Sequence, residues 1–240
     1  MRLPPADTDT HADQAAPLVR WLAGTGIGAV CLCAALLAYL HVAGPTAQLS
    51  PVRRTISEYA LLETGYIFNV AVLALAAGSL AVLVALAVAR LVGWYSGGAL
   101  AMVLWCAGLV GVVLFEKHNW AVGPSVNGDI HRLAGLVAFV SLPVAALLIG
   151  RSWLHDPRWG RHAGCSVAAG MVSLLCFAPI AIAFLTEPWT GVPWWRAIPL
   201  GAVERLLGLS ELAAVVVLGT WALCATSPAT RSRGRAPRNA

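Results

Sequence analysis

Charge is scarce in this sequence. Only 11% of its 240 residues are Asp, Glu, Lys or Arg, whereas a soluble globular chain carries about 25%. Hydrophobic residues make up 59% of the chain. This balance excludes an ordinary soluble protein and is typical of a membrane protein.

The signatures of common soluble enzymes are also missing. The chain has no HExxH, no GxSxG, no P-loop and no dinucleotide-binding fingerprint. Its six cysteines lie in or beside apolar runs and form no CxxC pair, which is typical of buried, unreactive cysteine. No two apolar segments look like an inverted repeat, so an ordinary secondary transporter has little support. The sequence assigns no cofactor.

Long apolar runs are what the chain has instead. A membrane-spanning helix needs about 20 mostly apolar residues. Six stretches qualify: 21–43, 66–92, 98–115, 130–149, 164–185 and 202–226. We therefore predict an all-α integral membrane protein with six transmembrane helices in one bundle, over residues 21–226. A tail of residues 1–20 precedes the bundle, and a basic tail of residues 227–240 follows it. Gly24 and Gly28 form a small-xxx-small pair that predicts close helix packing.

The basic residues favour one orientation of this bundle. Ten of the 16 Lys and Arg residues lie in the two tails and the even-numbered loops, and six lie in the odd-numbered loops and their helix ends. The positive-inside rule then places both termini in the cytoplasm. Because the net charge of +5 is spread over loops and one tail, we do not predict nucleic-acid binding.

Most of the remaining polarity lies in the odd-numbered loops, which share the outer side in this topology. They hold six of the 11 acidic residues. The first loop contains RRTISEYA at 53–60, which is too short and too polar to span a bilayer. Thr55 or Ser57 is placed to cap a short helix there. The stretch either closes the outer mouth as a re-entrant or interfacial segment, or is an exposed loop whose arginines meet lipid headgroups.

The start of the fourth span, NGDIHRL, carries a second polar group. Asp129 is predicted to be its N-cap, with His131 and Arg132 in the first turn. A helix N-terminus disfavours cations, so we expect an anionic partner for Arg132. A metal or acid–base site is conceivable from four residues: Glu116, His118, Asp129 and His131. Asp129 and His131 are only two apart, which is poor spacing for one helical face, and no metal site is assigned.

Two carboxylates mark the sixth span. Glu204 and Glu211 are seven residues apart and share a face, with Glu211 about 10 Å deeper at 1.5 Å per residue. An intramembrane carboxylate is costly, so Glu211 is either a functional group or part of an ion pair with an arginine such as Arg54 or Arg132. His41, at the outer end of the first span, either joins this cluster or lies at the membrane interface. The tryptophans of the outer loops, among them Trp194 and Trp195, form an aromatic belt or line a pocket for an apolar ligand.

The assembled segments resemble a bacterial membrane family known as domain of unknown function 998. The resemblance runs over roughly residues 20–226 and is most specific in ISEYAL and IHRLAG. The residues that carry it are Ser57, Glu58, Tyr59, Gly78, His131, Gly135, Glu204 and Arg205. It implies a six-helix integral membrane protein of actinobacterial type, located in the bacterial cell membrane. One departure is FEKHNWAVG after the third span, where family members often carry a Phe-Pro-x-Asp-like stretch; the role of that aspartate is absent here or has passed to Glu116 or His118.

Three functions fit these features. The favoured hypothesis is a membrane enzyme acting on a lipid or isoprenoid-like substrate by cyclisation, hydrolysis or group transfer. The alternatives are a non-catalytic scaffold or binding protein and, with less support, a small-molecule transporter. We expect membrane lipid as a partner, and an apolar small molecule as a further candidate ligand. The candidate catalytic residues are Asp129, His131, Glu211, His118, Glu116 and Ser57. The candidate substrate-binding residues are Arg54, Glu58, Tyr59, Arg132, Trp194, Trp195, Glu204 and Arg205.

Overall fold

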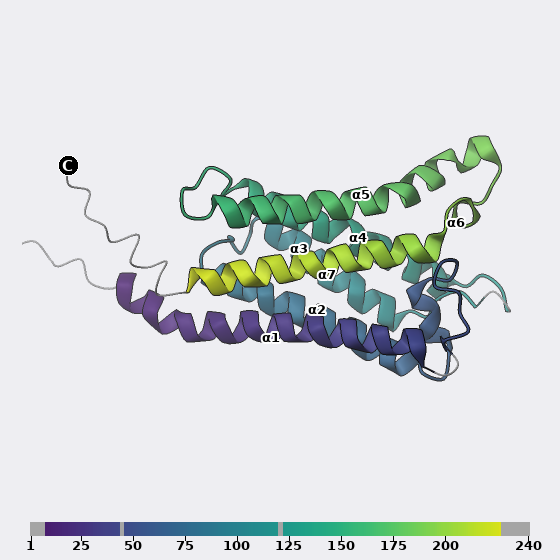
Figure 1. Ribbon diagram of the computed structural model, residues 1–240, viewed down its shortest axis with the longest axis horizontal. Helices are drawn as coiled ribbons and strands as arrows, with labels where there is room; N and C mark the ends of the chain where they lie inside the picture. The colour runs from purple at the N-terminus through teal and green to yellow at the C-terminus, as the bar shows by residue number, and fades with distance from the viewer. Residues whose placement is uncertain (1–7, 44–45, 120–121, 227–240) are drawn as a thin grey trace, which may run out of the picture.

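Six long helices lie side by side in the computed structural model, which describes residues 8–43, 46–119 and 122–226, with side chains from residue 15 onward (Figure 1). They are α1 (Thr8–Val42), α2 (Gly65–Val88), α3 (Gly97–Leu114), α4 (Val126–Arg151), α5 (Gly160–Thr190) and α7 (Leu200–Ala225). A 3-10 helix, η2 (Ile56–Leu61), follows α1, and the single turn α6 (Trp194–Ala197) precedes α7. Each long helix contains a stretch long and apolar enough to cross a membrane. The chain is a multi-pass membrane protein, which confirms the prediction of an all-helical, six-span bundle.

The helices form a closed ring in which consecutive spans are neighbours. Contacts join α1 to α2, α2 to α3, α3 to α4, α4 to α5, α5 to α7 and α7 back to α1. Helix α7 also contacts α2 and α4. Polar groups on α7 therefore lie within reach of most of the bundle, which makes its side chains the most informative ones for a functional site.

The bundle has two chemically different ends. We call the end that holds residues 46–64, 115–119, 122–125 and 191–199 the loop end, and the opposite end, where α1 begins and α7 finishes, the termini end (Figure 1). The termini end also holds residues 89–96 and 152–159. The placement of the termini end in the cytoplasm stays a prediction.

Helix ends differ from the sequence-based bounds where capping decides them. Ser125 caps α4, because its hydroxyl accepts a hydrogen bond from the Gly128 amide at 3.1 Å. The prediction that Asp129 is the N-cap was wrong, and His131 and Arg132 lie in the second turn rather than the first. Helix α1 already begins at Thr8, within the predicted tail of residues 1–20. The predicted tail of residues 227–240 lies outside the described residues.

The closest approach of α1 and α2 rests on glycines that the small-xxx-small pattern did not identify. A Cβ on Gly26 would lie 2.7 Å from the Gly78 carbonyl oxygen, and a Cβ on Gly78 would lie 2.6 Å from that of Ala29. Gly24 and Gly28 meet nothing within 4 Å. The prediction that these two mediate packing was wrong, because Gly26 lies on the opposite face of α1.

Candidate functional site at the loop end

The segment that contains RRTISEYA lies against the start of α7. The Ala202 amide donates to the Val52 carbonyl at 3.1 Å, and the Ile56 amide donates to a carboxylate oxygen of Glu204 at 2.8 Å. Gly201 lets the segment approach, because a Cβ there would lie 2.6 Å from the Pro51 carbonyl oxygen. Residues 56–61 form η2, with Thr55 at its N-cap position, although the Thr55 side chain makes no capping hydrogen bond. The segment is thus anchored to the bundle and is not a loose loop.

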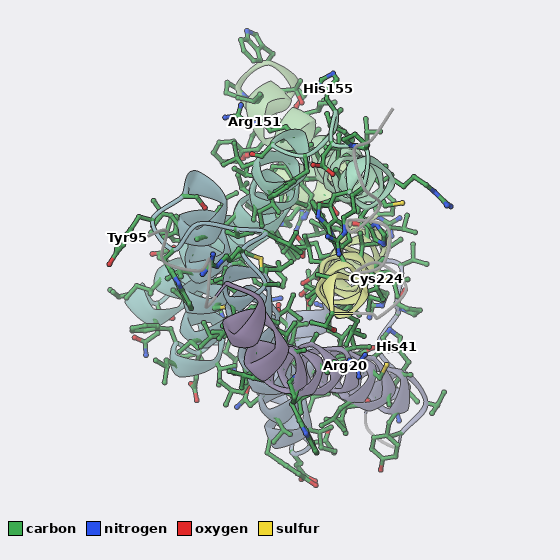
Figure 2. The ribbon with its side chains drawn as sticks, turned by 90° about the vertical axis from the view of Figure 1, so that its left-hand side faces the viewer. Arg20, His41, Tyr95, Arg151, His155 and Cys224 are labelled. Carbon is green, nitrogen blue, oxygen red and sulfur yellow. The ribbon has the colours of Figure 1, made fainter. Side chains whose placement is uncertain are left out.

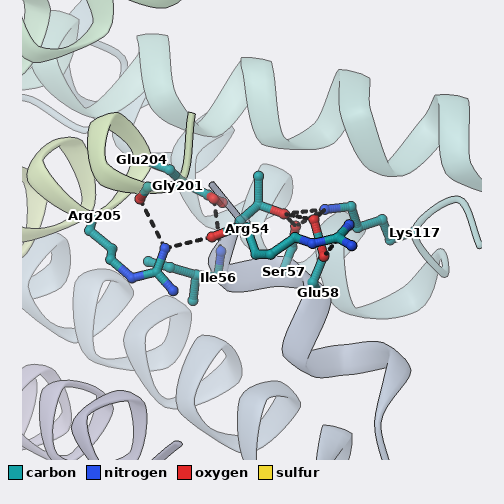
Figure 3. Close-up of polar contacts among 9 residues, drawn as sticks. Arg54, Ile56, Ser57, Glu58, Lys117, Gly201, Glu204 and Arg205 are labelled. Atoms are coloured by element: carbon teal, nitrogen blue, oxygen red, sulfur yellow. Dashed lines mark hydrogen bonds and ion pairs between the residues drawn. The ribbon is translucent and has the colours of Figure 1, made fainter. Parts of the chain in front are cut away.

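Lys117 and four side chains around it form what we call the Lys117 cluster (Figure 3). Its members are Arg54, Thr55, Ser57, Glu58 and Lys117. The Lys117 ammonium donates to the Ser57 hydroxyl at 3.1 Å and to the Thr55 hydroxyl, and lies 3.6 Å from a Glu58 oxygen. Glu58 also pairs with Arg54 at 3.3 Å and accepts a hydrogen bond from Thr55 at 3.3 Å. The ammonium therefore has two hydroxyl acceptors and, at ion-pair distance, one carboxylate.

The environment of Lys117 combines burial with opposite charge. Its side chain is 16% exposed. Burial lowers the Lys117 pKa below its usual 10.5, and the carboxylates of Glu204 and then Glu58 oppose that decrease. The lysine thus joins the third interhelical loop to η2 and to α7 by electrostatic contacts as well as hydrogen bonds.

Arg205 forms a second centre on α7, one residue after Glu204. Its guanidinium donates to His41 Nε2 at 2.7 Å, to the carbonyls of Arg54 and Gly201 at 2.7 and 2.9 Å, and to the Tyr59 hydroxyl at 3.0 Å. Since His41 Nε2 accepts, its Nδ1 carries the proton and donates to the Leu37 carbonyl at 2.6 Å. The Tyr59 ring lies edge-on to His41, with centroids 5.5 Å apart. His41 therefore belongs to this centre around Arg205 and links the end of α1 to α7.

His118 and Asp129 hold the start of α4. His118 is buried, its Nδ1 accepts a hydrogen bond from the Ser125 amide at 3.0 Å, and its Nε2 lies 3.2 Å from an Asp129 oxygen. The Asp129 side chain is 70% exposed. This pair satisfies an amide at the helix start.

His131 serves the end of α3. It is buried, and its Nδ1 lies 3.0 Å from the carbonyl oxygens of both Val112 and Phe115. Carbonyls only accept, so Nδ1 carries the proton and donates to them. Those contacts tie the last turn of α3 to α4, and they place the lone pair of the neutral ring on Nε2.

Glu211 lies apart from both clusters. It is 1% exposed, and neither of its carboxyl oxygens has a hydrogen-bond partner among the described residues. Cys176 on α5 lies near this carboxyl group. The Ser173 hydroxyl, one turn earlier on α5, is likewise buried without a partner. Glu211 on α7 and Ser173 on α5 are therefore two buried polar side chains whose hydrogen-bonding capacity is unused.

The other predicted site residues lie at the surface of the loop end. Glu116 and Arg132 are exposed, and Arg132 forms no ion pair with a described residue. Trp194 and Trp195 pack edge to face, with centroids 5.8 Å apart, and Trp195 is 41% exposed. Within residues 8–43, 46–119 and 122–226, no group of three or more His, Cys, Asp or Glu side chains is arranged to hold a metal ion.

The sequence analysis missed the residue at the centre of the first cluster. Lys117 is the only lysine of the chain, and a lone lysine between an apolar span and a loop is a usable signal. Its role depends on a contact with Thr55 across 62 positions, which no local pattern encodes.

Comparison with known proteins settles the family. The family described as "Protein of unknown function (DUF998)" matches residues 27–221. The chain belongs to this family. Of the residues that carried the resemblance, Ser57, Glu58, Tyr59 and Arg205 lie in the two loop-end centres. Glu204 accepts the hydrogen bond of the Ile56 amide, and Gly78 lies at the α1–α2 contact. No curated protein and no solved structure matches the chain significantly.

Proposed function

We propose that this DUF998 protein is a non-catalytic scaffold or binding protein of the bacterial cell membrane, and that its loop-end polar residues form a cap that locks the helix ends together. The observation that carries this proposal is the closure of the two centres upon themselves. Lys117, Glu58 and Arg205 direct their charges at protein groups contributed by α1, η2, the α3–α4 loop and α7. A site that binds substrate leaves some of that capacity unused until the substrate arrives.

The individual catalytic candidates support the same proposal. His118 and His131 bind backbone groups at helix ends, and Asp129 is exposed beside one of them. Ser57 donates to Thr55 and accepts from Lys117. These contacts explain each residue by architecture, in the way that buried polar groups are ordinarily satisfied.

A double-mutant cycle between Lys117 and Glu204 tests the cap. Residues that serve structure destabilise a protein when replaced, whereas residues kept for chemistry often stabilise it when replaced. We expect Lys117→Met and Glu204→Gln each to lower the free energy of unfolding, by about 1–2 kcal/mol. We expect a coupling of roughly 0.5–3 kcal/mol between them, as for groups in one network. Thermal unfolding in detergent measures both quantities.

The control is Lys117→Met combined with Glu63→Gln. Glu63 is exposed and is not among the groups that act on Lys117. We expect these two changes to be additive. If Lys117→Met and Glu204→Gln are each neutral or stabilising and show no coupling, the proposed cap is wrong. The enzyme hypothesis for the Lys117 cluster would then be favoured.

Glu211 favours a second candidate function, in which a carboxylic acid inside the bundle takes part in proton exchange with a membrane substrate. An ionised carboxylate without partners is very costly at this depth, so the group is held as the neutral acid.

Such an acid reacts with a hydrophobic carbodiimide, and mass spectrometry detects the adduct. We expect the adduct on the native chain and not on Glu211→Gln, and we expect Glu211→Leu to raise the unfolding midpoint. Destabilisation by Glu211→Leu, with no adduct on the native chain, would exclude this second function.

A further inference from the structure

Two arginines at the termini end have no neutralising partner among the described residues. Arg90 and Arg151 are exposed, and within the described part of the chain neither side chain forms a hydrogen bond or an ion pair. Asp156 is the one acidic side chain described at this end, and its carboxylate accepts from the amides of Arg158 and Trp159 at 2.8 Å. Arg90 and Arg151 therefore retain their full capacity to bind an anion.

These two arginines line one hollow. It has a volume of about 440 Å³ and lies between the α2–α3 connection, the first residues of α3 and the end of α4. Arg90 also borders an adjoining hollow of about 450 Å³, whose other walls include Ala87, Val88 and Trp94. A basic hollow next to an apolar one, at the end of a transmembrane bundle, matches a charged headgroup and the start of its acyl chains.

The backbone holds Arg90 in a conformation that arginine disfavours. Its φ is +59°, the left-handed region that usually takes glycine. It stands where a glycine commonly ends a helix, because its amide donates to the Ala87 carbonyl at 3.0 Å and the next amide, of Leu91, reaches the Leu86 carbonyl at 2.9 Å. Because this backbone conformation is unfavourable for arginine, we infer that the Arg90 side chain has a function.

The loop beside the hollow is fixed and carries exposed aromatic side chains. The Trp153 indole donates to the Leu91 carbonyl at 2.8 Å, which ties the α2–α3 connection to the residues after α4. Trp94 is 57% exposed, and Tyr95 is fully exposed and projects from the bundle (Figure 2). Exposed Trp and Tyr side chains at a helix end favour the membrane interface. The anion at this hollow is therefore expected to come from a lipid.

We propose that the hollow between Arg90 and Arg151 binds a phosphate group, namely the headgroup of an anionic phospholipid. Guanidinium groups suit phosphate because they offer paired donors in a fixed plane. The predicted orientation places this end at the cytoplasmic leaflet, whose surface is anionic. This site is independent of the loop-end cap and of any function proposed for Glu211.

Native mass spectrometry of the full chain in detergent tests the site with three probes: phosphatidylglycerol, phosphatidylcholine and inorganic phosphate. We expect one retained phosphatidylglycerol on the native chain and no specific retention of phosphatidylcholine. Arg151→Gln and Arg90→Gly should each weaken phosphatidylglycerol binding by roughly fivefold, the value of one arginine near a lipid surface. Arg161→Gln is the matched control, because Arg161 is exposed and unpaired at the same end but borders neither hollow, and it should bind as the native chain does.

Arg90→Gly separates binding from folding. Glycine relieves the left-handed conformation, so this variant should unfold at a temperature equal to or above that of the native chain while it loses lipid. Retention of inorganic phosphate without preference for phosphatidylglycerol would support the phosphate site and overturn its assignment to lipid. Equal phosphatidylglycerol binding by the native chain, Arg151→Gln and Arg90→Gly would overturn the site itself.

Discussion

Two groups of cations, one at each end of this bundle, are satisfied in opposite ways. At the loop end, Lys117 and Arg205 reach carboxylate, hydroxyl, imidazole or carbonyl groups of other segments, and Arg54 pairs with Glu58 four residues further on. At the termini end, Arg90 and Arg151 point at no described protein group. Cations that have protein partners hold a structure together, whereas cations that lack them remain available to a ligand. On this contrast rest our two proposals, a structural cap at the Lys117 and Arg205 centres and a lipid site at Arg90 and Arg151.

The glycines support the same division. At the loop end, Gly201 is small so that residues 51–54 can lie on α7. At the termini end, the position that would suit glycine holds Arg90 instead. The residue type therefore suits the local backbone at Gly201, in the proposed cap, and does not suit it at Arg90, where an exposed charge is present.

The largest expected effect comes from Arg205→Met. It leaves the His41 nitrogen, the Tyr59 hydroxyl and two carbonyls without their donor. We expect a loss of about 3 kcal/mol in the free energy of unfolding, since each unsatisfied buried group costs about 1–3 kcal/mol. Tyr59→Phe removes one of these bonds and should cost about 1 kcal/mol. Thermal unfolding in detergent ranks the variants.

Arg196→Met is the matched control for that measurement. Arg196 lies at the same end, is exposed, and its guanidinium contacts no described hydrogen-bond acceptor, so its replacement should change stability by less than about 0.5 kcal/mol. Equal losses for Arg205→Met and Arg196→Met would erase the distinction between partnered and unpartnered cations on which the comparison rests.

The fold was predictable from sequence because a bilayer imposes a simple rule. About 20 apolar residues make a span, and six such runs gave six helices. Helix ends were less predictable, because Ser125 and Asp129 are both good capping residues and only the position of His118 favours the former. Glu58, Tyr59, Glu204 and Arg205 were identified as site residues, but their partners were not. Tyr59 and Arg205 meet across 146 positions, and no local periodicity encodes such a contact.

The smallest expected effect is a pH dependence that belongs to Lys117. Burial lowers its pKa in the folded protein below 10.5, so over an interval below 10.5 the unfolded chain holds a proton that the folded protein has released. Stability rises with pH wherever the unfolded state binds more protons, so the contribution of Lys117 increases as pH rises toward 10.5. The difference in unfolding midpoint between the native chain and Lys117→Met should therefore widen from neutral pH to 10.5. All other ionisable groups are common to both chains, so their effect cancels in the difference. If the difference in unfolding midpoint narrows instead, the carboxylates of Glu204 and Glu58 outweigh the effect of burial on the Lys117 pKa. Electrostatic attraction would then contribute more than packing to the position of Lys117 at the loop end.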